Sequence, residues 1–140
     1  MSRHKSRVIA MQALYQIELT GVNISDALSF SWYDKELDPV EKEMATVLIK
    51  GVVKNWDLLD NIIKSYSVNW DFKRISVVNR CILRLSIYSI INQRDIPAKV
   101  VINEALELTR EFETEASVSF INGILDSVYK DELSKLSGDI

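Results

Sequence analysis

Apolar residues recur every three or four positions along most of the chain, the spacing that places them on one face of an α-helix. These stripes predict six helices, over residues 3–20, 25–33, 39–65, 77–91, 99–112 and 118–133. No stretch of useful length alternates apolar and polar residues, as a half-buried strand does. The pattern therefore predicts an all-α, single-domain bundle of about six to seven helices over residues 1–133, with a polar tail over 134–140.

Capping residues mark where several of these helices begin. Asp38 precedes Pro39, and Glu41 follows three residues after the cap, a combination typical of a helix start. Ser76 and Ser117 stand where caps are expected for the fourth and the sixth segments, and Ser2 for the first. These signals support the predicted boundaries independently of the apolar pattern.

Two further features indicate how the bundle packs. Gly51 interrupts an apolar stripe, where glycine costs about 1 kcal/mol relative to alanine, so we expect a close crossing of two helices there. Segment 77–91 is apolar nearly all round, which is typical of a buried central helix. Residues 71–76 form the connector before it, with room for one helical turn.

Composition excludes several classes of protein. Four Gly and two Pro are fewer than the tight turns of a sheet-rich fold require. A single Cys excludes a disulfide framework, and with a single His it excludes a zinc site built on those ligands. The most apolar run, residues 81–91, contains Arg84 and is too short for a membrane span. No signal-peptide cleavage site is visible, so we expect a soluble, cytoplasmic protein.

Charge is distributed unevenly along the chain. Arg3, Lys5 and Arg7 give the first seventeen residues a charge of +3, and the rest carries −6, which together make the −3 of the whole chain. A cationic terminus on an acidic body indicates a local contact with a polyanion, and the alternative is a solvated helix start. Arg3 and Arg7 share a helix face about 6 Å apart, close to the spacing of adjacent phosphates. We expect these terminal cations to be exposed.

Catalytic constellations are not visible. His4 lies in a terminal segment, and Cys81 lies in the central apolar segment, where a small core residue is the simpler interpretation. Glu104, Glu107 and Glu111 share one helix face, and we expect a solvated surface rather than a metal site because no His accompanies them. No phosphate loop or dinucleotide fingerprint occurs. We therefore expect no enzyme activity, no cofactor and no metal.

Arg80 and Arg84 lie one turn apart on the otherwise apolar segment 77–91. In one interpretation they orient a protein partner around an apolar centre. In the other they pair within the chain, with acids such as Asp71 or Glu104, and close the bundle. The residues themselves leave both interpretations open.

Three stretches of the chain resemble the NusB transcription antitermination family. They read RHKSRVIAMQALYQIEL from residue 3, VVNRCILRLSIYSII from residue 77, and DIPAKVVINEALELTREF from residue 95 followed by SFINGILD. The matches keep the family's order and spacing to about residue 130. The resemblance implies an all-helical protein without enzyme activity. It also implies binding to boxA RNA as a heterodimer with NusE, a ribosomal small-subunit protein, within an RNA polymerase antitermination complex acting chiefly on ribosomal RNA operons.

The resemblance also assigns residues by position. The RNA-binding positions fall on a basic cluster and three aromatic residues: Arg3, His4, Lys5, Arg7, Tyr15, Phe112 and Phe120. Cations along a backbone and aromatic faces under bases are how single-stranded RNA is held. The partner surface falls on Asn79, beside Arg80 and Arg84. With only three or four cations, the isolated protein should bind RNA weakly and need a partner that enlarges the surface.

Some positions depart from the family pattern. His4 stands where many members have Arg, which makes one phosphate contact dependent on pH. Asn79 replaces a usual acid, Ala116 lacks a common acid and Ser119 lacks a common base. Some RNA methyltransferases carry a NusB-like domain, but this sequence, which ends at Ile140, contains no Gly-rich cofactor loop. The alternative to RNA binding is a self-associating helical module, including a homodimer that hides the basic surface.

Overall fold

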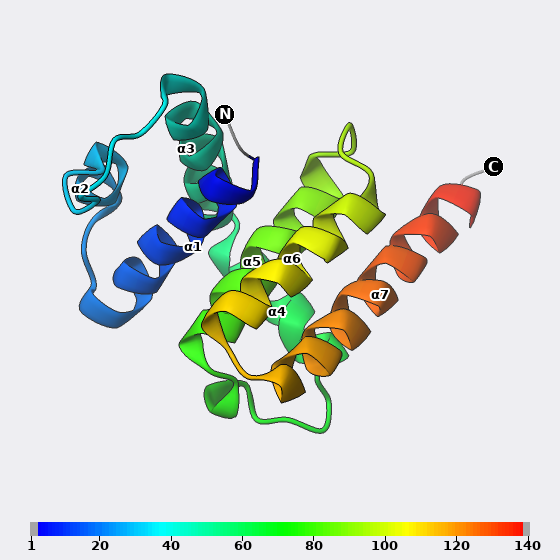
Figure 1. The fold of residues 1–140 in the computed structure, drawn as a ribbon. Helices are drawn as coiled ribbons and strands as arrows, with labels where there is room; N and C mark the ends of the chain where they lie inside the picture. The colour runs from blue at the N-terminus through cyan, green and yellow to red at the C-terminus, as the bar shows by residue number, and fades with distance from the viewer. Residues whose placement is uncertain (1–2, 139–140) are drawn as a thin grey trace.

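The structure is a computed structural model that describes the backbone of residues 3–138 and the side chains of residues 3–135. The described part holds seven α-helices and one 3-10 turn (Figure 1). They are α1 (Arg3–Thr20), α2 (Ile24–Ser29), α3 (Pro39–Lys54), α4 (Trp56–Tyr66), η1 (Phe72–Arg74), α5 (Val77–Asn92), α6 (Ala98–Phe112) and α7 (Glu115–Gly138). No strand occurs within residues 3–138, so the predicted all-α class is confirmed.

Several predicted boundaries are confirmed with their caps. The side chain of Asp38 accepts a hydrogen bond from the N–H of Val40, and that of Ser76 accepts one from the N–H of Asn79. Gly21, just after α1, has a φ of +69°, the left-handed conformation that ends many helices. The predicted cap of α1, Ser2, lies outside the described residues.

The single helix predicted over residues 39–65 is wrong, because α3 and α4 are separate helices that meet at Asn55. The amide Nδ2 of Asn55 donates to the carbonyl of Gly51 at 2.8 Å, where its own N–H also bonds. A side chain that bonds to the backbone in this way competes with continuation of the helix. The apolar stripe runs across the break, so periodicity alone does not reveal it.

Two other helices differ from prediction at their ends. α2 is capped by Asn23, and it ends at Ser29 rather than near Tyr33 because Phe30 takes a positive φ of 55°. α7 begins at Glu115, so Ser117 lies inside the helix and is not its cap. α7 also continues to Gly138, into the predicted polar tail, whose separation from the domain at residue 133 stays a prediction.

α5 is the centre of the bundle. It packs against α1, α3, α4, α6 and α7, and in Figure 1 it lies between the group of α1 and α3 and the pair of α6 and α7. Its side chains from Cys81 to Leu83 are fully buried, which confirms the predicted central helix. A Cβ on Gly51 of α3 would collide with the ring of Tyr88 of α5, so the close helix crossing predicted at Gly51 is also confirmed. None of the described helices is both long and apolar enough to cross a membrane.

Candidate nucleic-acid interface

The first two turns of α1 carry the basic cluster, which consists of Arg3, His4, Lys5 and Arg7. It faces the acidic face of α6, which consists of Glu104, Glu107 and Glu111. Nε2 of His4 lies 2.6 Å from Oε1 of Glu111, and Nδ1 of His4 lies 3.4 Å from Oε2 of Glu107. The acidic face is therefore not simply solvated, as the sequence suggests, because its carboxylates pair with Arg3, His4 and Arg7 of α1.

Glu104 is held between two arginines of the basic cluster. Nη1 of Arg3 lies 3.7 Å from Oε1 of Glu104, and Nε of Arg7 lies 3.3 Å from Oε2. Neither Nε of Arg7 nor Oε2 of Glu104 has hydrogen-bond geometry with any partner, although both atoms are buried. Burial raises the pKa of Glu104 above its usual value, and the attraction of Arg7 and Arg3 does not fully offset it.

Arg7 is the one member of the cluster that is buried, with a side chain only 1% exposed. Its Nη1 donates to Oγ of Ser89 at 3.1 Å, and its Nη2 donates to Oγ of Ser86 at 3.4 Å. Burial lowers the pKa of Arg7 to about 10, against the opposing attraction of Glu104. The expectation that all the terminal cations are exposed is thus wrong for Arg7, which ties α1 to α5.

The other cations of the cluster remain accessible. The side chains of Arg3 and Lys5 are 44% and 38% exposed. Nζ of Lys5 lies 3.6 Å from the carboxylate of Glu41 and donates to the carbonyl oxygen of Glu36. Arg3 and Lys5 thus form an exposed cationic edge at the start of α1, with the less exposed His4 between them.

The three predicted aromatic contacts fall in two places. Tyr15 and Phe112, both partly exposed, line one hollow of about 350 Å³ between α1 and the end of α6. Phe120, on α7, lies in a different hollow, where its ring packs edge-on against Trp70 with centroids 5.5 Å apart. The structure therefore brings Tyr15 and Phe112 together and leaves Phe120 apart from them.

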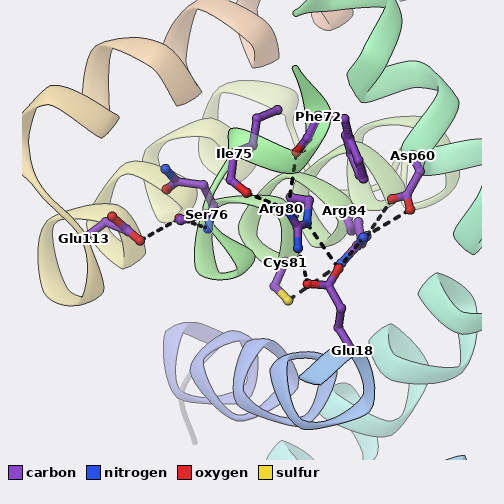
Figure 2. A network of polar contacts seen from close by, with 10 residues as sticks. Glu18, Asp60, Phe72, Ile75, Ser76, Arg80, Cys81, Arg84 and Glu113 are labelled. Carbon is purple, nitrogen blue, oxygen red and sulfur yellow. Dashed lines mark hydrogen bonds and ion pairs between the residues drawn. The ribbon is translucent and has the colours of Figure 1, made fainter. Parts of the chain in front are cut away.

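Arg80 and Arg84 form a closed network that we call the α5 arginine network, with Glu18 of α1 and Asp60 of α4 (Figure 2). Nε and Nη2 of Arg80 donate to the two oxygens of Glu18 at 3.2 and 2.6 Å. Nη2 of Arg84 lies 2.7 Å from Glu18, and its Nε donates to Asp60 at 2.6 Å. The guanidinium of Arg84 also lies over the Trp56 ring, 4.0 Å from its centroid.

The network supports the intramolecular interpretation of these arginines, although its acids are Glu18 and Asp60 rather than Asp71 or Glu104. The side chain of Arg84 is 1% exposed, which leaves no surface for direct contact with a partner, and that of Arg80 is 13% exposed. Burial opposes ionisation of Glu18, yet hydrogen bonds from Arg80 and Arg84 hold its pKa below the usual value. Burial alone would lower the pKa of Arg84, but the hydrogen bonds and charges of Asp60 and Glu18 outweigh burial and raise it.

Two predicted residues of α5 lie beside the network. Burial raises the pKa of Cys81 to about 12, which fits a core residue rather than a nucleophile. Asn79 is 6% exposed, and its Nδ2 donates to Oγ of Ser117 at 3.0 Å, which joins α5 to α7. Oδ1 of Asn79 is buried and has no hydrogen-bond partner. No group of three or more His, Cys, Asp or Glu within the described part of the chain is placed to hold a metal ion.

Sequence reasoning missed three residues of these sites, namely Glu18, Asp60 and Trp70. Glu18 and Asp60 carry no local signal, since each pairs with an arginine 24 or more residues away. Trp70 precedes the predicted connector. Its one signal in the sequence is a large aromatic side chain within a polar stretch.

Comparison with known proteins agrees with this architecture. The model of the NusB family matches residues 4–130. A curated relative from Leptospira biflexa, the transcription antitermination protein NusB, is 55% identical over 132 residues, 94% of each chain. The solved structure of T. maritima NusB is 35% identical, with a TM-score of 0.85 over 93% of this chain and 92% of that one. A crystal structure of antitermination factors NusB and NusE in complex with double-stranded RNA shares the fold at 24% identity, with a TM-score of 0.82 over 92% of this chain and 96% of that one.

Proposed function

This chain belongs to the NusB family, and we propose that it is a transcription antitermination factor that binds boxA RNA together with NusE. In this role it modifies elongating RNA polymerase, chiefly on ribosomal RNA operons. The NusB relatives are named transcription antitermination proteins, and one solved structure of the fold holds NusB and NusE in complex with double-stranded RNA. We further propose that the protein acts in the cytoplasm and is not an enzyme.

The observation that carries the proposal is the incomplete pairing of Arg3 and His4 in the basic cluster. Arg3 reaches Glu104 only at 3.7 Å, and Nδ1 of His4 is buried without a hydrogen-bond partner. Phosphate oxygens accept the same hydrogen bonds as carboxylates and bring a full charge. An RNA backbone that approaches the start of α1 can therefore replace long contacts to the acidic face with shorter ones.

The burial of Arg7 and Arg84 divides the predicted site residues by role. Arg3, His4 and Lys5 are the residues that contact phosphates, while Arg7 positions them by fixing α1 to Glu104 and to α5. Tyr15, Phe112 and Phe120 offer aromatic faces to RNA bases. Arg80 borders the partner surface, and Arg84 supports it from the interior through Glu18 and Asp60, whereas Asn79, which is buried and bonded to Ser117, does not contact the partner directly.

The weak cationic character of the surface explains the need for a partner. Two exposed cations, Arg3 and Lys5, on a chain of net charge −3 supply few phosphate contacts, and each contributes modestly at physiological salt. A bound NusE that adds its own surface to the same strand would raise the affinity without any change in this chain. RNA binding should accordingly be much tighter for the heterodimer than for either protein alone.

Filter binding tests the proposal. Single-stranded RNA with a boxA-like sequence and a scrambled RNA of equal composition are each titrated with the protein, alone and with purified NusE. We expect a preference for the boxA-like RNA that NusE strengthens. No preference under either condition would reject the proposal and leave the self-associating module, whose dimer would then be sought by sedimentation.

A further inference from the structure

A second hollow, of about 330 Å³, opens where α5 begins and where α6 is joined to α7. The residues that matter for its chemistry are Trp70, Arg74, Asn79, Glu113, Ser117 and Phe120. We infer that this Trp70 hollow holds one unpaired RNA base, stacked on Trp70 and hydrogen-bonded to Asn79. The inference rests on the proposed function and adds to it a base-recognition site with two residues, Trp70 and Arg74, that the sequence did not suggest.

The first argument is the exposed aromatic pair. Trp70 is 57% exposed, although tryptophan is the largest side chain and is usually mostly buried. The ring of Phe120 meets it at an interplanar angle of 60° and braces it from α7. A braced, half-exposed indole is a platform for an unpaired base, because every base has an aromatic face and stacks with little preference for sequence.

The second argument is an unsatisfied acceptor in the wall of the same hollow. The Asn79 side chain is held in one orientation by the hydrogen bond from its Nδ2 to Ser117. Its Oδ1 is buried and unpaired, which is unfavourable unless something donates to it. The edge of every RNA base carries at least one N–H group, so a base stacked at the Trp70 hollow supplies the missing donor.

The charges around the hollow favour a base inside it and a phosphate outside. Glu113 lies in the wall and accepts the hydroxyl hydrogen of Ser76 at 2.7 Å, so its carboxylate repels a phosphate from the interior. Arg74 is exposed at the rim and offers a cation to the backbone on either side of the bound base. This distribution of charge fits a nucleotide whose base points into the hollow and whose phosphates stay outside.

The hollow also continues the proposed RNA path. Glu113 follows directly after Phe112 at the end of α6, and Glu111, one residue further back, holds His4 of the basic cluster. A strand bound along Arg3, His4 and Lys5 therefore reaches the Trp70 hollow by crossing the end of α6. The hollow and the basic cluster act on the same strand, one on a base and the other on phosphates.

Fluorescence anisotropy of a labelled boxA-like single strand, titrated with the heterodimer of this chain and NusE, tests the inference. Trp70→Ala should weaken binding about tenfold, while Trp70→Phe, which keeps an aromatic ring, should stay within about threefold of the parent. Asn79→Ala should weaken binding severalfold. Leu58→Ala, which removes an equally exposed apolar side chain from α4, serves as the control and should change nothing.

Two further readouts separate stacking from other roles. The dependence of affinity on salt should be unchanged in Trp70→Ala, because no phosphate contact is lost. Abasic sites are then placed at each position of the RNA in turn. At one position, the missing base should lower the affinity of the parent protein about as much as Trp70→Ala does. The same abasic RNA should bind Trp70→Ala no more weakly than intact RNA does. This second readout uses the unaltered protein, so it remains decisive if Trp70→Ala folds poorly.

The outcomes distinguish this inference from the proposed function. If the parent binds boxA-like RNA but Trp70→Ala and every abasic strand bind as tightly, the base site is refuted and the proposed function stands. If Trp70→Ala weakens association with NusE in the absence of RNA, the hollow is a protein-docking surface and the inference is overturned. If the parent binds no RNA with or without NusE, the proposed function fails and the base site fails with it.

Discussion

Two groups of arginines and carboxylates join helices of this bundle, and they differ in how completely their hydrogen bonds are formed. In the α5 arginine network the nitrogens of Arg80 and Arg84 lie 2.6 to 3.2 Å from the oxygens of Glu18 and Asp60. In the basic cluster, Arg3 and Arg7 lie 3.7 and 3.3 Å from Glu104. The first group is closed, whereas the second leaves donors and acceptors unused.

The two central glutamates show the consequence. Both are partly removed from water, which opposes their ionisation, but bonded arginines lower the pKa of Glu18, while burial raises the pKa of Glu104. A satisfied ion pair holds helices in place, and a poorly satisfied one exchanges its partner when a better acceptor arrives. We therefore assign stability to the α5 arginine network and ligand exchange to the basic cluster.

The largest effect on stability should come from opening the α5 arginine network. Arg84→Met leaves Asp60 unpaired and Glu18 with one arginine, and should lower the free energy of unfolding by about 3–5 kcal/mol. Urea unfolding followed by circular dichroism measures it. Arg94→Met, which removes a half-exposed arginine paired with Glu132, is the control and should cost less than about 1 kcal/mol. Equal losses in the two variants would show that the network is not structural.

The same substitution placed in both groups should have unequal effects. Glu18→Gln removes the bridge between two arginines and should cost about 3 kcal/mol. Glu104→Gln removes a carboxylate whose ionisation is already opposed by burial, and should change the free energy of unfolding by less than about 1 kcal/mol. A greater loss from Glu104→Gln than from Glu18→Gln, in the same urea titrations, would reverse the comparison.

The two variants should also respond to pH in opposite directions. The folded pKa of Glu18 is depressed, so its contribution to stability is present above its ordinary pKa of 4.5 and is lost as the pH falls through the folded pKa. The folded pKa of Glu104 is raised, so its contribution is present below 4.5 and is lost as the pH rises through the folded value. Unfolding free energies of the parent minus each variant, measured across this range, should diverge accordingly, and parallel curves would contradict the assignment.

A smaller effect should appear in RNA affinity when the acidic face of α6 is weakened. Glu111→Gln removes the carboxylate closest to His4 and should raise the affinity for boxA-like RNA about two- to threefold, because less charge competes with phosphate. Stability should change by less than about 0.5 kcal/mol. Asp126→Asn, which removes an exposed carboxylate from a pair with Lys130 on α7, is the matched control. Equal RNA affinity in the two variants would show that the acidic face does not compete.

Local signals account for what the sequence predicts well. Asp38 with Pro39, and Ser76, are caps that act within one turn, and the buried α5 follows from its uniformly apolar composition. The break at Asn55 escapes prediction because a single side-chain hydrogen bond makes it while the apolar stripe continues. The apolar pattern along a helix does not reveal a break of this kind.

The candidate site was predictable only in part, because burial depends on distant residues. Arg3 and Arg7 look equivalent at i and i+4, yet α5 supplies Ser86 and Ser89 to Arg7 alone and removes it from solvent. The acids that satisfy Arg84 come from α1 and α4, and nothing near Arg84 in sequence names them. Long-range pairing thus decides which arginine is structural and which is available to RNA.

The salt dependence of RNA binding tests the central claim most directly, because it counts the cations that meet phosphates. Each contact with single-stranded RNA contributes about −0.7 to the slope of log K against log salt, so contacts from Arg3 and Lys5 contribute about −1.4. In Arg3→Ala/Lys5→Ala, bound to NusE and titrated with the same boxA-like RNA, the slope should flatten by about 1.4 and the affinity should fall. An unchanged slope and affinity in the double variant would place the RNA surface elsewhere on the molecule.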